Sequence, residues 1–341
     1  MADWVARDEG ARRTGALSAE LEASLVFNVV WTGTVFTYLG SFVASQMHYC
    51  GARYRFVANG CPPDQIELMQ QFRAQWPDRV VEVLETSDTM RPHGASLDAV
   101  QSLRNDGPFF CTVDPDILAL GPFLAPFVKA LDSCAAITSG RGVWRDDDVV
   151  PAGHPGVSGE YFYSQDGFVF GSPHFAIYHR APLDATTRRW SVRFGEGGPG
   201  LSDAARARLA QSGHDYMLYD TGKLVNIFLQ EDGNVLRHAE NANLMHVGGL
   251  SHYLAPPRMI EREGEEPEPD WARWRGMSSR FEVARFTAAV LRALCEGREP
   301  PAVPPGLEPA MAAKLEKVRT ALIVTVKRFD TAAPSGLDGG R

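Results

Sequence analysis

Apolar runs of strand type alternate with runs of helix type through residues 25–142, and this alternation limits the folds open to the chain. The strand-like runs are LVFNVVWTG (25–33), YRFVANGC (54–61), RVVEVLETS (79–87), PFFCTVD (108–114) and AAITSGRG (135–142). Helix-like runs separate them at 37–51, 62–76, 96–106 and 121–132. The pattern predicts an α/β fold with a Rossmann-like, mainly parallel sheet, right-handed crossovers and helices on both faces.

The strand-like runs end in polar residues. These ends are Thr32-Gly33-Thr34, Asn59-Gly60, Ser87-Asp88 and Asp114-Pro115-Asp116. Ligands of open parallel sheets bind beyond the carboxyl ends of the strands, where the strand order switches. We therefore expect these four ends to form a pocket on one rim of the sheet.

Two carboxylates, Asp114 and Asp116, interrupt the apolar stretch FFCTVDPDILAL. Residues two apart in an extended chain project to the same side, and like charges so placed are hard to keep ionised without a cation. A hard divalent ion such as Mg²⁺ or Mn²⁺ would resolve the repulsion and bridge to substrate phosphates. The alternative is a solvated Asp-Pro-Asp turn that caps a helix starting near Gly121.

Composition excludes several classes of protein. The net charge is −8 and no block of lysine or arginine stands out, which argues against a nucleic-acid partner. Neither a GxGxxG nor a P-loop signature is present. The five cysteines are scattered without a CxxC pair, so neither a zinc site nor a disulfide framework is indicated, and a cytoplasmic location is expected.

Residues 25–52 contain no Asp, Glu, Lys or Arg, and a stretch of this length could span a bilayer. Their many hydroxyl groups and the Asn, Gln and His among them favour a buried strand, a loop and a helix instead. We therefore expect no transmembrane span here.

The order strand, helix, strand, helix, strand, helix, apolar strand and then D-x-D resembles the GT-A glycosyltransferases that use nucleotide sugars, in particular family 2. The resemblance covers about residues 25–253 and has a second anchor in NANLMHVGGLSHY, where His246-Val247-Gly248 matches the H-x-G segment of many such enzymes. It implies that Asp114, Asp116 and His246 hold Mn²⁺ or Mg²⁺, with His252 as the other candidate histidine. It also implies a nucleotide-sugar donor, UDP-sugar before GDP-sugar.

The resemblance implies further donor contacts. Thr32, Gly33, Thr34 and Asn59 would meet the nucleobase and ribose, while Asp114 would face both the ribose and the metal. Arg91 would meet phosphate. Asp98 would meet ribose or orient a partner, although Asp98 also fits ordinary chemistry at a helix N-terminus.

The segment RGVWRDDDVVPAGHPGVSGEYFYSQDG (141–167) lies where the family places acceptor recognition. Trp144, Tyr161 and Tyr163 would stack on a small-molecule, glycan or peptide acceptor, or else pack locally. SPHFAIYHRAPL (172–183) follows as a strand with His174 near its start.

Asp220 precedes a helical stretch and has two interpretations. It caps the helix, or it is the catalytic base that an inverting transferase needs near the acceptor hydroxyl. Inverting relatives often carry an acidic pair in this region, whereas the neighbour here is Tyr219.

The predicted organisation is a flexible leader (1–22), a GT-A catalytic domain (23–255) with a nucleotide-binding half (23–140) and an acceptor half (141–255), a linker with C-terminal helices (256–328), and a disordered tail (329–341). The C-terminal helices either pack on the catalytic domain or form a homodimer contact. The activity expected is metal-dependent glycosyl transfer. The alternatives are a nucleotidyltransferase, which would usually carry a glycine- and lysine-rich loop that WTGTVFTYLG (31–40) lacks, and a non-catalytic nucleotide-binding relative.

Overall fold

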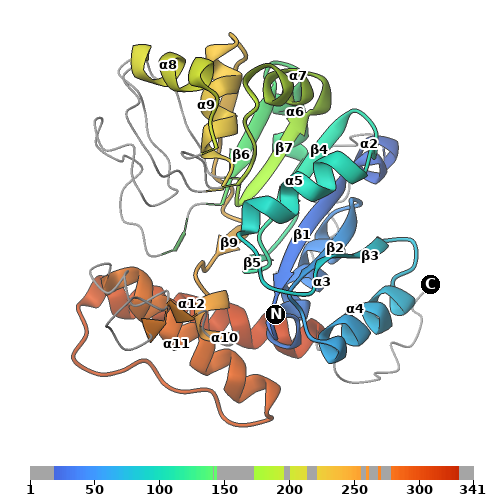
Figure 1. Ribbon diagram of the computed structural model, residues 1–341. Helices are drawn as coiled ribbons and strands as arrows, with labels where there is room; N and C mark the ends of the chain where they lie inside the picture. Colours follow the sequence, from blue (N-terminus) through green and yellow to red (C-terminus); the bar gives the residue numbers. More distant parts are fainter. Residues whose placement is uncertain are drawn as a thin grey trace.

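The computed structural model describes residues 19–140, 142–143, 173–195, 200–212, 221–254, 259–260, 268–269 and 278–329. All of the predicted tail except its first residue, Phe329, and all but the last residues of the predicted leader lie outside these ranges. Helix α2 begins at Ala19, within the predicted leader. The main body is a layered α/β arrangement, with the last two helices stacked beneath it (Figure 1).

The strands run as follows: β1 (Val26–Thr32), β2 (Arg53–Asn59), β3 (Val80–Ser87), β4 (Phe109–Val113), β5 (Ile117–Ala119), β6 (Ala136–Ser139), β7 (Phe175–His179), β8 (Leu236–His238), β9 (Leu244–His246), β10 (Met259–Ile260) and β11 (Glu268–Pro269). The helices are α2 (Ala19–Ser24), α3 (Phe36–Tyr49), α4 (Pro63–Gln75), α5 (His93–Leu103), α6 (Leu124–Leu131), α7 (Arg180–Trp190), α8 (Asp203–Gln211), α9 (Lys223–Glu231), α10 (Ser251–Leu254), α11 (Ser278–Cys295) and α12 (Pro309–Phe329).

Seven of the described strands form one sheet in the order β3-β2-β1-β4-β7-β6-β8. Strands β1 to β4 pair in parallel, and so do β6 and β8. Helices α3, α4 and α5 separate the first four strands, and Asp114-Pro115-Asp116 follows β4. The predicted α/β fold with a mainly parallel sheet is therefore confirmed.

Strand β7 runs antiparallel to both of its neighbours, β4 and β6. Its ladder with β4 pairs Val113, the last residue of β4, with Phe175, the first residue of β7. The start of β7 therefore lies at the same rim as the carboxyl end of β4, and so does the residue before it, His174.

A small ladder extends this rim. β5 pairs antiparallel with β9, and Ile117 lies opposite His246. The apolar residues before His246 thus form a strand, as expected from the sequence, and this strand brings His246 next to the residue that precedes β5, Asp116.

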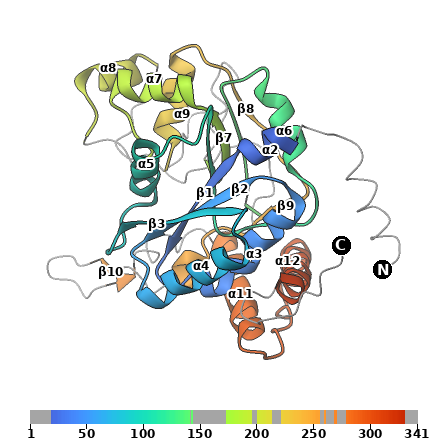
Figure 2. The ribbon, with the colours of Figure 1, turned by 90° about the vertical axis from the view of Figure 1, so that its right-hand side faces the viewer.

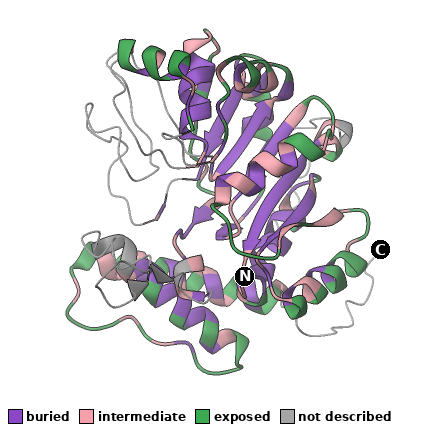
Figure 3. Ribbon diagram, viewed as in Figure 1, coloured by how far each residue is buried: buried purple, intermediate pink, exposed green. Residues whose placement is uncertain are grey.

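Apolar side chains pack on both faces of the sheet, because successive strand residues point to opposite sides. On one face Phe27, Val29 and Trp31 of β1 join a cluster that includes residues of α3, α4 and α6. On the other face Val30 and Phe110 pack with α5, α7 and α9. The sheet is buried from both sides (Figure 3), so its strands are rigid supports for the residues at their ends.

The two C-terminal helices pack on the domain through α3 (Figure 2). Leu315, Val318 and Leu322 of α12 are buried and share a cluster with Phe42 of α3. At the end of α12, the Arg328 guanidinium donates to the hydroxyl oxygen of Tyr49, over 3.2 Å. Because the apolar face of α12 is buried within the chain, the structure supports the first of the two alternatives, packing on the α/β domain, and does not support a homodimer through these helices.

None of the helices in the described ranges combines the length and the apolar character needed to cross a bilayer.

Candidate active site

Asp114 and His174 meet where β4 ends and β7 begins. The backbone N–H of Asp114 donates to the carbonyl oxygen of His174 over 2.6 Å. The side chains also meet, with 2.8 Å between His174 Nδ1 and Asp114 Oδ2. The antiparallel ladder therefore fixes this pair through both backbone and side chain.

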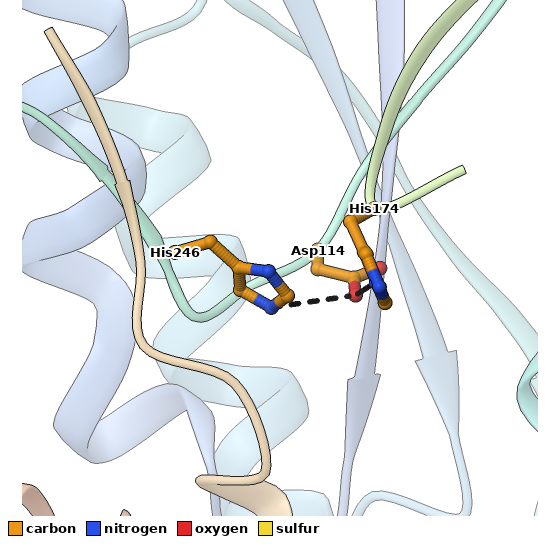
Figure 4. Close-up of side chains that lie close together, drawn as sticks. All are labelled: Asp114, His174 and His246. Atoms are coloured by element: carbon orange, nitrogen blue, oxygen red, sulfur yellow. Dashed lines mark hydrogen bonds and ion pairs between the residues drawn. The ribbon is translucent and has the colours of Figure 1, made fainter. Parts of the chain in front are cut away.

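Asp116 and His246 meet across the ladder of β5 and β9. His246 Nε2 lies 3.2 Å from Asp116 Oδ1 and 4.0 Å from Asp114 Oδ2. The backbone N–H of Leu250 donates to Asp116 Oδ2 over 3.3 Å. The other nitrogen of His246, Nδ1, lies 2.5 Å from the carbonyl oxygen of Gly140, and only a protonated Nδ1 can donate there. His246 therefore turns its Nε2 towards the two carboxylates; Figure 4 shows the approach to Asp114.

The charges of this pair support one another. Burial raises the pKa of Asp116, but the charge and hydrogen bond of His246 outweigh burial, so the pKa lies below its usual range. Burial lowers the pKa of His246, but Asp116 and then Asp114 outweigh it, so that pKa lies above its usual range. Each group therefore favours the charged form of the other.

The residues present fit a divalent cation. Asp114, His174 and His246 each offer one ligand atom, and these atoms lie within 4.8 Å of one another. The Gly140 carbonyl that holds Nδ1 of His246 is the kind of outer partner that orients a metal-binding imidazole. Asp116 is only 7% exposed, and α6 has Phe123 at its N-cap with no side-chain cap hydrogen bond. The alternative of a solvated turn that caps the next helix is therefore not supported.

A pocket of about 190 Å³ opens over these residues. Its wall includes Thr32, His93, Asp114, His174, Thr221 and His246. His93, the first residue of α5, places Nε2 3.8 Å from Asp114 Oδ1. The pocket thus gathers residues from both halves of the predicted domain at the carboxyl edge of β1 and β4.

The predicted donor residues are spread over several positions. Thr32 lines the pocket, and Gly33 follows it with a φ of 50°. The hydroxyl of Thr34 donates to the Leu254 carbonyl over 2.9 Å. That bond ties the end of β1 to α10.

Asn59 is fully buried and bonds to the backbone of Arg91 in both directions, over 2.8 and 2.9 Å. Asn59 therefore positions the loop before α5. The side chain of Arg91 is exposed, and its contact with phosphate stays a prediction. Asp98 accepts hydrogen bonds from the backbone N–H groups of Phe194 and Gly195, over 2.7 and 3.2 Å. Burial raises the pKa of Asp98 in spite of these two bonds.

Several predicted residues lie outside the described ranges: Asp220, Trp144, Tyr161, Tyr163 and the side chain of His252. The neighbour of Asp220 in the chain, Thr221, lines the pocket. Helix α9 has Gly222 at its N-cap and no side-chain cap hydrogen bond.

Sequence reasoning missed His174 and His93 as site residues. The strand after His174 was expected, but its direction was not. If that strand were parallel to β4, His174 would lie at the opposite rim. His93 lies in the segment RPHGASLDAV (91–100). The sequence predicts a helix from residue 96, but α5 begins at His93, so His93 was given no role.

No protein-family model matches the chain, and no curated protein matches it. Among similar solved structures is a mannosyltransferase from Pyrobaculum calidifontis in complex with GDP-Man and Mn²⁺, with 13% identity, a TM-score of 0.42 and coverage of 91% of this chain and 76% of that chain. A galactosyltransferase, LgtC, in complex with donor and acceptor sugar analogues has 11% identity, a TM-score of 0.42 and coverage of 76% and 95%. A 4-diphosphocytidyl-2C-methyl-D-erythritol synthase from Anaerococcus prevotii has 9% identity, a TM-score of 0.39 and coverage of 68% and 97%. We infer nothing about function from likenesses of this size.

Proposed function

We propose that this chain is a metal-dependent glycosyltransferase, which moves a sugar from a nucleotide-diphosphate sugar to an acceptor hydroxyl. One observation carries the proposal. Asp114, Asp116 and His246, from segments far apart in sequence, converge at the carboxyl edge of the sheet beside the pocket. This edge is where open α/β sheets bind their ligands.

Asp114, Asp116 and His246 would hold Mn²⁺ or Mg²⁺. Such an ion, when bound, neutralises negative charge that develops on the departing diphosphate. The nucleobase and ribose of the donor, a UDP-sugar before a GDP-sugar, would lie against Thr32, Gly33 and Thr34. Gly249 lines the pocket, and both Gly248 and Gly249 have positive φ, 70° and 72°. Backbone without a Cβ lets a diphosphate come close.

Asp220 is proposed as the catalytic base. Its neighbour Thr221 lines the pocket, and the cap position of α9 belongs to Gly222. A carboxylate within hydrogen-bond reach of the acceptor hydroxyl would take its proton as the sugar is transferred. We propose that residues 141–255 supply the acceptor half and residues 23–140 the donor half.

A thermal-shift experiment tests the proposal. The full chain is heated with UDP, GDP and other nucleoside diphosphates, with and without Mn²⁺ or Mg²⁺. Asp116→Asn removes the charge and keeps the shape of the side chain. Asp106→Asn is the matched control, since Asp106 bonds to Arg55 on the far side of the sheet from the pocket.

We expect a nucleoside diphosphate to stabilise the wild type and the Asp106→Asn variant only with metal, and Asp116→Asn to lose this response. Stabilisation by none of the nucleotides contradicts the proposal. A response to nucleoside triphosphates with release of pyrophosphate would identify a nucleotidyltransferase. Diphosphate binding without turnover of any nucleotide sugar would identify a non-catalytic relative.

A further inference from the structure

His174 occupies a position in the site that the proposed function does not use. It precedes β7, and the reversed direction of that strand brings it to the rim beside Asp114. Its ring lies 4.5 Å from the ring of His246, measured between centroids. The two imidazoles approach Asp114 from different sides (Figure 4).

The distances among these groups are those expected around one ion. With metal–ligand bonds of about 2.1 Å, ligand atoms of a single ion lie roughly 3 to 4 Å apart. His174 Nδ1 is 2.8 Å and His246 Nε2 is 4.0 Å from Asp114 Oδ2, while His246 Nε2 is 3.2 Å from Asp116 Oδ1. The ligand atoms of Asp114, His174 and His246 lie within 4.8 Å of one another, and Asp116 adjoins this group through its contact with His246.

Gly140 holds the imidazole of His246 in place from behind and lies close to His174. Its carbonyl oxygen accepts from His246 Nδ1. A Cβ at position 140 would come within 3.0 Å of His174 Cβ, so the backbone of Gly140 and His174 are in close contact. Supports of this kind fix the direction in which a metal-binding imidazole points.

We propose that His174 is a fourth protein ligand, and that the resulting two-imidazole, two-carboxylate site selects a first-row transition ion over Mg²⁺. Imidazole nitrogen binds transition ions well, whereas Mg²⁺ prefers oxygen and gives up its water reluctantly. Asp114, Asp116, His174 and His246 would hold the ion, and the ion would supply positive charge to the phosphates of a diphosphate. The inference rests on the proposed function only for the diphosphate. The choice between ions can be measured on the protein without any nucleotide.

Metal binding to the full chain, stripped with a chelator and without nucleotide, tests the inference. Mn²⁺ is titrated at constant pH and the free ion is followed by electron paramagnetic resonance, and Mg²⁺ is measured by competition. We expect Mn²⁺ to bind at least about tenfold more tightly than Mg²⁺, and His174→Asn to lose about tenfold or more of the Mn²⁺ affinity. The Mg²⁺ affinity should change less, so the ratio of the two falls.

Two further variants sharpen the result. His174→Asp offers oxygen in place of nitrogen and should move the preference towards Mg²⁺. His179→Ala removes a histidine from the other end of β7, where it contacts the Leu131 carbonyl, and should leave the ratio unchanged. Pulsed resonance on bound Mn²⁺ should show nitrogen couplings from two imidazoles in the wild type and from one in His174→Asn.

An unchanged ratio and unchanged nitrogen couplings in His174→Asn would overturn the inference, because His174 would then only be a hydrogen-bond partner of Asp114. This failure differs from failure of the proposed function. If no nucleotide stabilises the chain but Mn²⁺ binding still depends on His174, the transferase proposal is rejected and His174 remains a metal ligand.

Discussion

Gly140→Ala should weaken both the fold and the metal site. Gly140 has a φ of 97°, a backbone conformation that costs an L-residue about 1 to 3 kcal/mol. The new methyl group would also lie 3.0 Å from His174 Cβ and 3.2 Å from Ile117 Cδ1, and overpacking of this kind costs about 1 to 3 kcal/mol more. Lower entropy of the unfolded chain offsets about 0.4 to 1 kcal/mol.

Gly107→Ala is the matched control. Gly107 has a φ of 109°, but a Cβ there would meet nothing within 4 Å, and the residue is exposed. Its replacement carries the backbone strain without the contacts. We therefore expect Gly140→Ala to lower the free energy of unfolding by about 1 to 3 kcal/mol more than Gly107→Ala does.

The assays are urea unfolding in the presence of a chelator and Mn²⁺ titration of the folded chain. Displacement of the Gly140 carbonyl should also reduce Mn²⁺ affinity about 10- to 100-fold, the usual effect of losing an outer partner of a ligand. Gly107→Ala should bind Mn²⁺ as the wild type does. Equal stability of the two variants, together with wild-type Mn²⁺ affinity in Gly140→Ala, would refute the role given to Gly140.

Three other predictions concern the scaffold. Hydrogen bonds led by that of Arg104 lower the pKa of Glu82 from 4.5 to about 2, so its contribution to stability is complete above about pH 4.5 and disappears as the pH falls towards 2. In urea unfolding, Glu82→Gln should therefore lower the free energy of unfolding by roughly 1 kcal/mol at pH 7 and by less at pH 3. The value at pH 7 is small because Glu82 and Arg104 are both partly exposed. Asp98→Ala leaves two backbone amides without their acceptor and should lower the free energy of unfolding by about 1 to 3 kcal/mol, with Asp98→Asn closer to the wild type. Leu322→Ala removes a fully buried side chain of α12 and should cost about 2 to 5 kcal/mol in the same assay, whereas a cost below about 0.5 kcal/mol would show that α12 does not dock on α3.

The sequence predicts the first four strands and their polar ends well, because both signals are local. A β-branched run ending at Thr32-Gly33 or at Asp114 needs no distant partner to be recognised. The short strand β5 was missed for the opposite reason. Its partner β9 lies far along the chain, and three apolar residues after Asp116 carry no sign of that pairing.

The direction of β7 also cannot be read from its residues. FAIYH is apolar and suits either direction, and only the ladders with β4 and β6 fix it as antiparallel. That single choice decides whether His174 joins Asp114. The role of Asp98 cannot be read from its neighbours either, because a carboxylate near a helix start can bind a ligand or accept hydrogen bonds from the protein backbone. In the structure it accepts from the backbone N–H of Phe194.

The reversal of β7 has a consequence for the segment between β6 and β7. Strand β6 ends at the rim of the sheet where Asp114 lies, and β7 begins there, so the chain leaves and re-enters the sheet at neighbouring points, Gly140 and His174. The entropic cost of closing a loop whose ends already meet grows only slowly with its length. A sequence of another length between Val143 and Pro173 therefore costs little more entropy to close, so under the proposed function this is a place to graft a new acceptor specificity. Gly142 and Val143 themselves should be kept, because both pair with the backbone of His246.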